Sequence, residues 1–152
     1  MRERLPMAGF CEDFEKLLTV IDRGSPVGKR DYAILSLISN LGIRATDVFA
    51  LKKENFNFPC SRLDFIQRKS SQPVSLPLQG DTGHAVIDYL KNGRPDCETS
   101  FVFVSHSNDS LGTPLRPGYV YILLEKYMRL LGVRLTARQI HGLYLLRHQR
   151  VS

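Results

Sequence analysis

The sequence places an arginine between two predicted helices, where it could bind an anion. Arg44 follows Gly42, which ends the first helix, and precedes Thr46 and Asp47, which suit the first turn of the second. A guanidinium fork and a helix N-terminus both favour phosphate, so this pattern indicates a phosphate site at the bend. The alternative is a solvated arginine paired with Asp47 three residues further on.

A lysine lies in the turn between two predicted strands. Residues 63–68 and 74–78 flank a polar turn, and the second run alternates apolar and polar side chains, which predicts a hairpin. Pro73 and Pro77 confine the second strand to a sheet edge. Lys69 is therefore expected near the tip of the hairpin, reaching outward; the alternative is a solvated edge lysine that blocks aggregation.

The element that must position Arg44 is the most apolar predicted helix, residues 31–41. Apolar residues recur there at i, i+3, i+4 and i+7, and two more widen the stripe to most of the circumference: Ile34, Leu37, Ile38 and Leu41, then Tyr32 and Leu35. Such a helix is expected at the centre of the core.

Other patterns predict the surrounding elements. An amphipathic helix over residues 12–21 is stopped by Gly24 and Pro26, and a second covers 81–91. Residues 101–104 read as a short apolar strand, and Pro117 is expected at the first position of a helix that runs to Leu131.

Composition limits the class of protein. A chain of 152 residues with 43% hydrophobic and 24% charged residues fits one folded domain. No apolar run reaches the ~18 residues of a spanning helix, and the N-terminus lacks a signal peptide, so we expect a cytoplasmic protein with no membrane partner. The net charge of +6 favours a polyanionic partner.

The ligand-forming residues do not predict a metal site. Cys11, Cys60 and Cys97 are odd in number and widely spaced, so we expect reduced thiols and neither a disulfide framework nor a zinc site. The histidines also lack ligand spacing. No metal and no cofactor are therefore expected.

Several motifs together resemble the tyrosine recombinases, the phage-integrase-type site-specific recombinases. Their first arginine box matches residues 42–51, and their strand, lysine turn and strand ending in Leu-Pro-Leu match residues 67–78. Residues 142–148 resemble their second box, Gly-Leu-His-x-Leu-Arg-His, with Tyr144 in place of the first histidine and Arg147 kept. The match runs in order from about Leu5 to Arg147.

The resemblance implies roles for four residues. Arg44 and Arg147 would clamp the scissile phosphate and stabilise the phosphorane, while Lys69 would protonate the departing 5′ oxygen. Tyr144 could supply only a hydroxyl donor where the family has histidine. His141 is a weak substitute, because it precedes the box histidine's position by three residues.

The resemblance also implies a fold. We expect a mainly α, α+β catalytic domain with a small antiparallel sheet at one edge. Residues 1–152 would be a single partial catalytic domain whose residues 1–10 are linker-like. The family's N-terminal DNA-clamping domain and C-terminal nucleophile segment are expected to be absent, since none of the six tyrosines follows Arg147.

The expected function is site-specific DNA recombination and integration by strand breakage and rejoining, with this chain binding duplex DNA but not cleaving it. Family members assemble as oligomers on DNA, whereas this chain is expected to be monomeric alone. Two alternatives stay open. One is a non-catalytic DNA-binding remnant that competes for recombination sites, and the other is an interaction domain with no nucleic-acid role.

Overall fold

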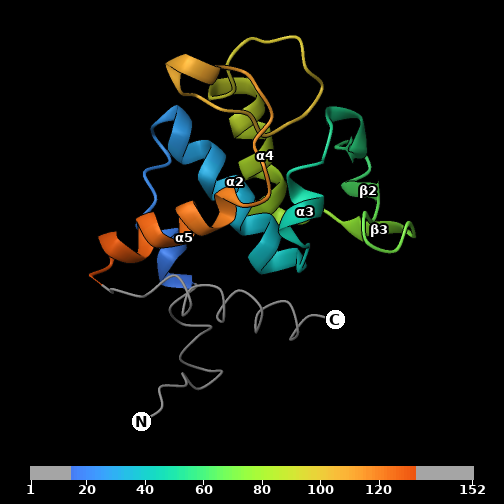
Figure 1. The fold of residues 1–152 in the computed structure, drawn as a ribbon. Helices are drawn as coiled ribbons and strands as arrows, with labels where there is room; N and C mark the ends of the chain where they lie inside the picture. Colours follow the sequence, from blue (N-terminus) through green and yellow to red (C-terminus); the bar gives the residue numbers. More distant parts are fainter. Residues whose placement is uncertain (1–14, 133–152) are drawn as a thin grey trace.

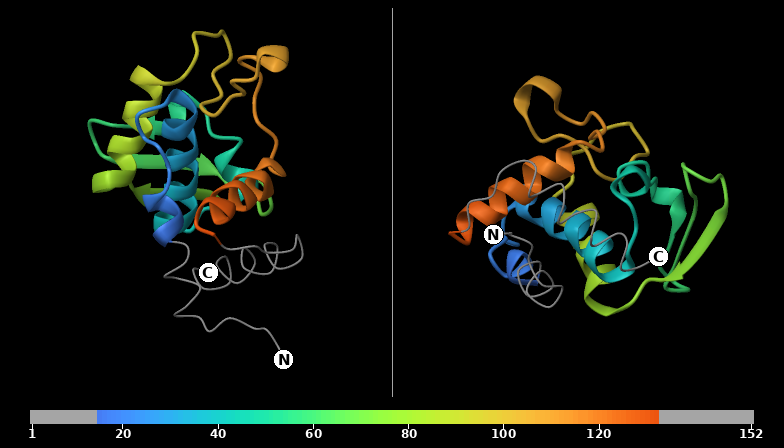
Figure 2. Two further views of the ribbon diagram at one scale, coloured as in Figure 1. Left: turned by 90° about the vertical axis from the view of Figure 1, so that its left-hand side faces the viewer. Right: turned by 60° about the horizontal axis from the view of Figure 1, so that its bottom comes forward.

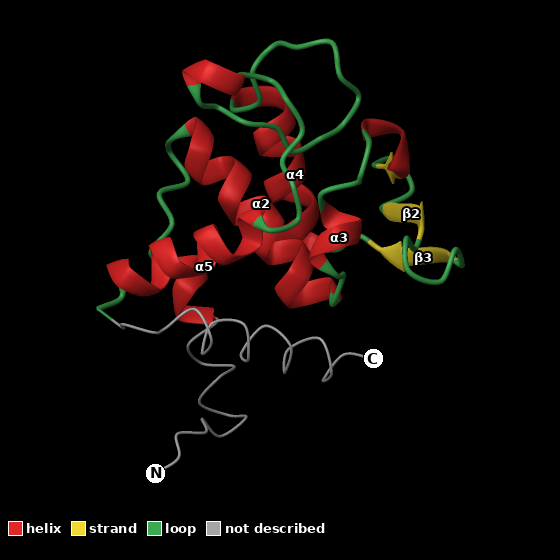
Figure 3. Ribbon diagram, in the orientation of Figure 1, coloured by secondary structure: helices red, strands yellow, loops and turns green. Residues whose placement is uncertain are grey.

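The computed structural model describes residues 15–132 as helices gathered around one central helix, with a small sheet at one side (Figure 1). After a helical turn at 15–19, the helices are α2 (Pro26–Leu41), α3 (Ala45–Val48), α4 (Gly80–Asn92) and α5 (Tyr119–Leu130). The strands are β1 (Phe56–Asn57), β2 (Arg62–Ile66) and β3 (Pro73–Pro77), and two 3-10 turns are η1 (Lys53–Asn55) and η2 (Asn108–Ser110). Figure 3 shows how little of the chain is strand. The predicted mainly helical α+β class is confirmed.

The central helix is longer than its apolar pattern predicted. It begins at Pro26 and not at residue 31, because Ser25 caps it: the Ser25 hydroxyl accepts a hydrogen bond from the Gly28 amide at 2.9 Å. Pro26 occupies the first turn, where the missing amide proton has no cost. Reading Pro26 only as a stop signal was wrong, since it opens the next helix. The predicted end is confirmed, with Gly42 in the left-handed conformation at φ 71°.

Helix α2 forms the centre of the core. Five of its apolar residues have no exposed surface at all: Ala33, Ile34, Leu35, Leu37 and Ile38. Helix α4 packs along it, with a hydrogen bond of 2.8 Å between the Ser36 and Thr82 hydroxyls, and Val86 and Tyr89 of α4 are also fully buried. A buried leucine exchanged for alanine typically costs about 2–5 kcal/mol, so this helix carries much of the domain's stability. Figure 2 shows α2 from two further sides, enclosed by the other elements.

A buried ion pair joins α2 to α5. Asp31 is fully buried and lies 2.9 Å from Arg30, which is 3% exposed. The Tyr127 hydroxyl of α5 donates to the other Asp31 oxygen at 2.6 Å. Arg30 also donates to the Val104 carbonyl at 3.1 Å. These bonds compensate the desolvation of both charges and fix α5 and the loop before it on the first half of α2.

The sheet has the order β1-β2-β3, with both pairs antiparallel. Leu63 pairs with Leu76 and Phe65 with Val74, and the β2 side chains Leu63 and Phe65 are buried. The predicted hairpin and the edge position of its second strand are confirmed. Strand β1 was not predicted, because two residues are too short for a periodic pattern.

Three predicted boundaries are wrong. Residues 101–104 contribute only isolated bridges at Phe101 and Val104, because the Arg94 guanidinium takes the carbonyls of Thr99, Phe101 and Val102 that a ladder would use. Helix α5 starts at Tyr119 and not at Pro117, which lies in a preceding turn. The helix after Arg44 ends at Val48, so Leu51 lies outside it and instead accepts from the Val102 amide.

Candidate active site

Arg44 stands at the junction of α2 and α3, with its backbone held on both sides. Its carbonyl accepts hydrogen bonds from the amides of Asp47 and Val48, each at 2.9 Å, which makes Arg44 the N-terminal cap of α3. Its neighbours Ile43 and Ala45 are both 4% exposed. Because the flanking residues are buried, the half-buried Arg44 side chain leaves the core from a rigid anchor point.

Asp47 connects this junction to the hairpin. Its side chain is 3% exposed, and one carboxylate oxygen accepts a hydrogen bond from the Arg68 backbone amide at 2.9 Å. No salt bridge within residues 15–132 joins Asp47 to Arg44, so the alternative of a simple pair between them is not what the structure shows. A charged acceptor for a backbone amide is stronger than a neutral one, so Asp47 fixes the base of the hairpin turn.

Lys69 lies in that turn and is exposed. The turn is closed by two backbone hydrogen bonds of 2.8 Å, from Gln67 to Gln72 and from Ser71 to Gln67. The Ser70 hydroxyl donates to the Gln67 side-chain oxygen at 2.6 Å, and Ser71 takes a left-handed φ of 59°. The turn is therefore ordered by its own bonds, while the Lys69 side chain extends into solvent.

The two described cations consequently lie on adjoining segments. Arg44 caps α3, Asp47 of α3 binds the amide of Arg68, and Lys69 is the next residue. In Figure 1, α3 lies beside the hairpin formed by β2 and β3. Arg44 and Lys69 are 25 positions apart in the sequence, and their segments are linked through one buried carboxylate, that of Asp47.

Tyr144 and Arg147 lie outside the described residues, as do His141 and Cys11. Cys60 and Cys97 are free thiols. Between residues 15 and 132, the histidine, cysteine and acidic side chains form no group of three that could hold a metal ion, and no helix there is both long and apolar enough to cross a membrane.

The sequence suggested Asp47 as a possible ion-pair partner of Arg44, in the alternative interpretation of that arginine, and did not reveal the partner that Asp47 has. Its partner, the Arg68 amide, is 21 positions away and is a backbone group, so no pattern of side chains could reveal it. The buried pair of Arg30 and Asp31 was also missed. Adjacent charges of opposite sign at Arg30 and Asp31, directly before the apolar stretch of the helix, were the available signal, because charges next to a core are buried only when paired.

The model of the phage integrase family matches residues 11–149. This chain belongs to that family. The family includes the tyrosine recombinases, so the resemblance carried by the two arginine boxes and the lysine hairpin is confirmed at the level of the family.

Individual relatives agree with this assignment. Tyrosine recombinase XerD of Listeria innocua is 32% identical over 129 residues, covering 80% of this chain and 41% of the relative. Tyrosine recombinase XerC of Bacillus pumilus is 28% identical over 134 residues, covering 84% of this chain and 42% of the relative. This family member thus spans less than half the length of these relatives.

Solved structures show the same fold. The XerA recombinase matches with a TM-score of 0.63 at 15% identity, over 95% of this chain and 49% of that one. The integrase of mycobacterium phage Brujita matches with a TM-score of 0.60 at 16% identity, over 95% and 44%. At these identities the likeness concerns the fold alone.

Proposed function

We propose that this phage integrase family member binds duplex DNA at a phosphate site formed by Arg44, Lys69 and Arg147, as part of site-specific recombination by strand breakage and rejoining. The observation that carries the proposal is the hydrogen bond from the Arg68 amide to Asp47, which holds the lysine turn against the arginine junction. A shared phosphate needs both cations within reach of one point, and this bond brings their segments together.

The chemistry assigned to each residue follows from its type. Attack on a phosphodiester produces a phosphorane with additional negative charge, and guanidinium forks at Arg44 and Arg147 stabilise that charge. The Lys69 ammonium donates a proton to the 5′ oxygen as it leaves. A lysine on an ordered turn with a free side chain suits this role, because it can close on the substrate after DNA has bound.

We further propose that these 152 residues alone form no covalent bond to DNA. A nucleophilic tyrosine must reach the phosphate in line, and two of the described tyrosines are buried: Tyr89 and Tyr127 are 0% and 3% exposed. The Tyr32 and Tyr119 hydroxyls are bonded to Asp81 and Arg30. Tyr144 matches a histidine position of the second box, where a hydroxyl would lie beside the arginines and not behind the scissile bond.

The DNA-binding proposal is tested by titrating a labelled duplex at several salt concentrations. We expect weak binding with little sequence dependence that falls steeply as salt rises, because phosphate contacts give affinity without base readout. Arg44→Gln should weaken it, while Lys91→Gln, a matched charge loss on exposed α4 surface, should change it little. Absence of binding at low salt, or equal losses in both variants, would contradict the proposal.

The cleavage proposal is tested with a nicked duplex that traps covalent intermediates, followed by a denaturing gel. No protein–DNA adduct is expected from the 152 residues. An adduct that disappears in Tyr144→Phe would show that Tyr144 is the nucleophile and would overturn the proposal. The assay is run at a salt concentration at which the titration shows duplex binding, so that absence of an adduct reports on the covalent step and not on failure to bind.

A further inference from the structure

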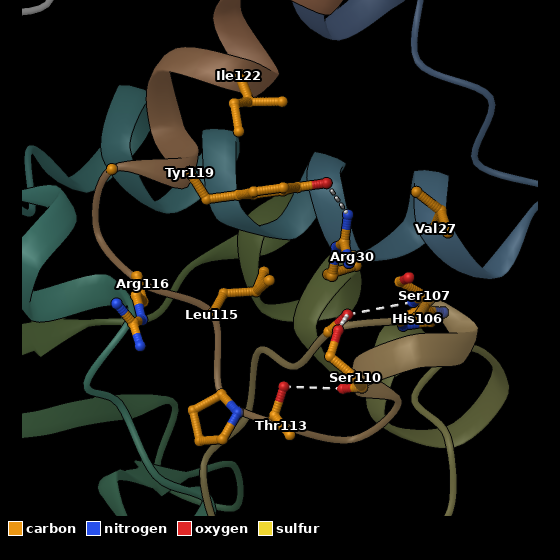
Figure 4. Close-up of a pocket in the computed structure, with 13 residues that line it drawn as sticks. Val27, Arg30, His106, Ser107, Ser110, Thr113, Leu115, Arg116, Tyr119 and Ile122 are labelled. Carbon is orange, nitrogen blue, oxygen red and sulfur yellow. Dashed lines mark hydrogen bonds between the residues drawn. The ribbon is translucent and has the colours of Figure 1, made fainter.

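A cavity of about 790 Å³ opens between the start of α2, the loop around η2 and the start of α5. Figure 4 shows its walls. Neither Arg44 nor Lys69 lines it, so it is separate from the phosphate site described above. Its volume lies in the range of pockets that hold small organic ligands.

The two sides of this cavity differ in chemistry. Val27, Leu115 and Ile122 supply apolar surface, and the Tyr119 ring lies between Leu115 and Ile122 (Figure 4). Ile122 is 56% exposed, although large apolar side chains of this domain are mostly buried. The opposite side carries hydroxyls, among them those of Ser107, Ser110 and Thr113. The Thr113 hydroxyl already donates to the Ser110 carbonyl, and the Ser110 hydroxyl is hydrogen-bonded to that of Ser105. A ligand that fills the cavity therefore needs a flat apolar part and a polar part that faces this hydroxyl-bearing side.

The charges around the cavity select an anion of low charge. Arg30 forms part of the wall, but its guanidinium is occupied by Asp31, the Val104 carbonyl and the Tyr119 hydroxyl, so it acts as a rigid support. Arg116 is exposed at the rim and forms no ion pair with any residue of the described stretch 15–132. One available guanidinium can hold one phosphate group through paired hydrogen bonds, whether that phosphate is a diester or a monoester.

His106 contributes hydrogen bonding and little charge. Its Nε2 lies 3.1 Å from the Tyr89 hydroxyl, and the two rings are stacked with centroids 5.8 Å apart. Burial, aided by the charge of Arg30, lowers the pKa of His106 below its ordinary value, which favours the neutral ring. A neutral imidazole can form hydrogen bonds with a nucleobase, and because it carries no positive charge it does not require a second negative group on the ligand.

We propose that this cavity is a nucleotide-binding pocket, in which a base packs against Tyr119, Ile122 and Leu115 while its phosphate is held by Arg116. An aromatic ring beside a cation is a general means of holding a nucleotide without reading its sequence. The nucleotide could be a free mononucleotide or one unit of a DNA strand, and both offer this chemistry. The pocket is a second contact with nucleotide chemistry and does not depend on the Arg44 site.

The proposal is tested by titrating the isotope-labelled 152-residue protein with thymidine 5′-monophosphate, a single-stranded tetranucleotide and inorganic phosphate, and by following the methyl resonances of Ile122 and Leu115. We expect these resonances to shift with at least one nucleotide probe. Shifts with the monophosphate would show that a free nucleotide is sufficient for binding. Shifts with the tetranucleotide alone would show that the pocket binds a nucleotide only as part of a strand. Both results support the proposed pocket.

Two exposed variants separate binding from folding. Arg116→Gln should weaken binding of the active probe at least fivefold, and Ile122→Thr should weaken it without changing the fold. Lys91→Gln should leave it within twofold. The proposal is overturned if neither nucleotide probe shifts the Ile122 and Leu115 methyls, if inorganic phosphate alone reproduces the shifts, or if Lys91→Gln weakens binding as much as Arg116→Gln. A Lys69→Gln variant that weakens duplex binding but keeps these shifts distinguishes the two sites.

Discussion

The helical core and the β2–β3 hairpin are held by different kinds of interaction. In the core, Asp31 has no exposed surface and is bound by Arg30 and Tyr127. In the hairpin, Lys69 is exposed, and the turn that carries it contacts α3 through a single buried carboxylate, that of Asp47. The core supplies stability, and the hairpin supplies an accessible cation. Substitutions should therefore affect folding in the first region and function in the second.

The largest effect on stability is expected from Asp31→Asn. This change keeps the shape of the side chain but leaves the Arg30 cation buried without its anion, and breaking a buried pair by removing one partner costs about 3–5 kcal/mol. Chemical denaturation measures the loss. Asp109→Asn, at an exposed position of η2, is the control and should stay within about 0.5 kcal/mol. Equal effects of the two variants would show that the ion pair does not stabilise the core.

Alkaline pH probes the core through a second buried group. Burial raises the pKa of Tyr89 to about 12, whereas a tyrosine in the unfolded chain titrates near 10. The folded state therefore holds the Tyr89 proton more tightly than the unfolded chain does. Its contribution to the free energy of unfolding is fully present below pH 10, and about 2–3 kcal/mol of it is lost as the pH rises toward 12.

Tyr89→Phe should make the alkaline loss smaller. At neutral pH the variant should be less stable by about 1 kcal/mol, because the hydrogen bond to His106 is gone. Above pH 10 the gap to the wild type should narrow or reverse, as measured by urea unfolding across pH 7 to 12. Parallel stability curves for the two proteins would contradict the raised pKa.

Asp47→Ala tests the link between the two regions. The Arg68 amide loses its charged acceptor, and such a bond contributes about 2 kcal/mol. The Arg68 amide proton should exchange faster with solvent in the variant than in the wild type. Duplex binding should also weaken, because Lys69 is no longer held beside α3. Asp64→Ala, an exposed carboxylate on neighbouring β2, serves as the control. An unchanged exchange rate of the Arg68 amide would show that Asp47 does not hold the hairpin turn.

Lys69→Gln should have the smallest effect on stability, within about 0.5 kcal/mol, because the side chain is exposed. Its effect on function should nevertheless be measurable. Loss of one phosphate contact lowers the slope of log affinity against log salt by about one. If Lys69→Gln lost as much stability as Asp31→Asn, the hairpin would contribute to folding as the core does, and the proposed difference between the two regions would be wrong.

Much of the fold was predictable from local patterns. The apolar spacing of residues 31–41 identified the central helix, Gly42 marked its end, and the prolines of β3 predicted an edge strand. These features depend on helix periodicity, glycine's access to positive φ and proline's missing amide proton, all of which act within a few residues. The motifs around Arg44 and Lys69 likewise identified the family from the chain alone.

Only the tertiary structure decided which distant groups meet. Asp47 binds the amide of Arg68 and not the guanidinium of Arg44, and Asp31 of α2 accepts a hydrogen bond from Tyr127, 96 positions away. Residues 101–104 have the composition of a strand but form no ladder, because Arg94 takes the carbonyls of Phe101 and Val102 and Arg30 takes that of Val104. These pairings depend on which groups are buried in the same part of the fold. A polar group that is removed from water must pair with whichever partner the packing brings within hydrogen-bonding distance.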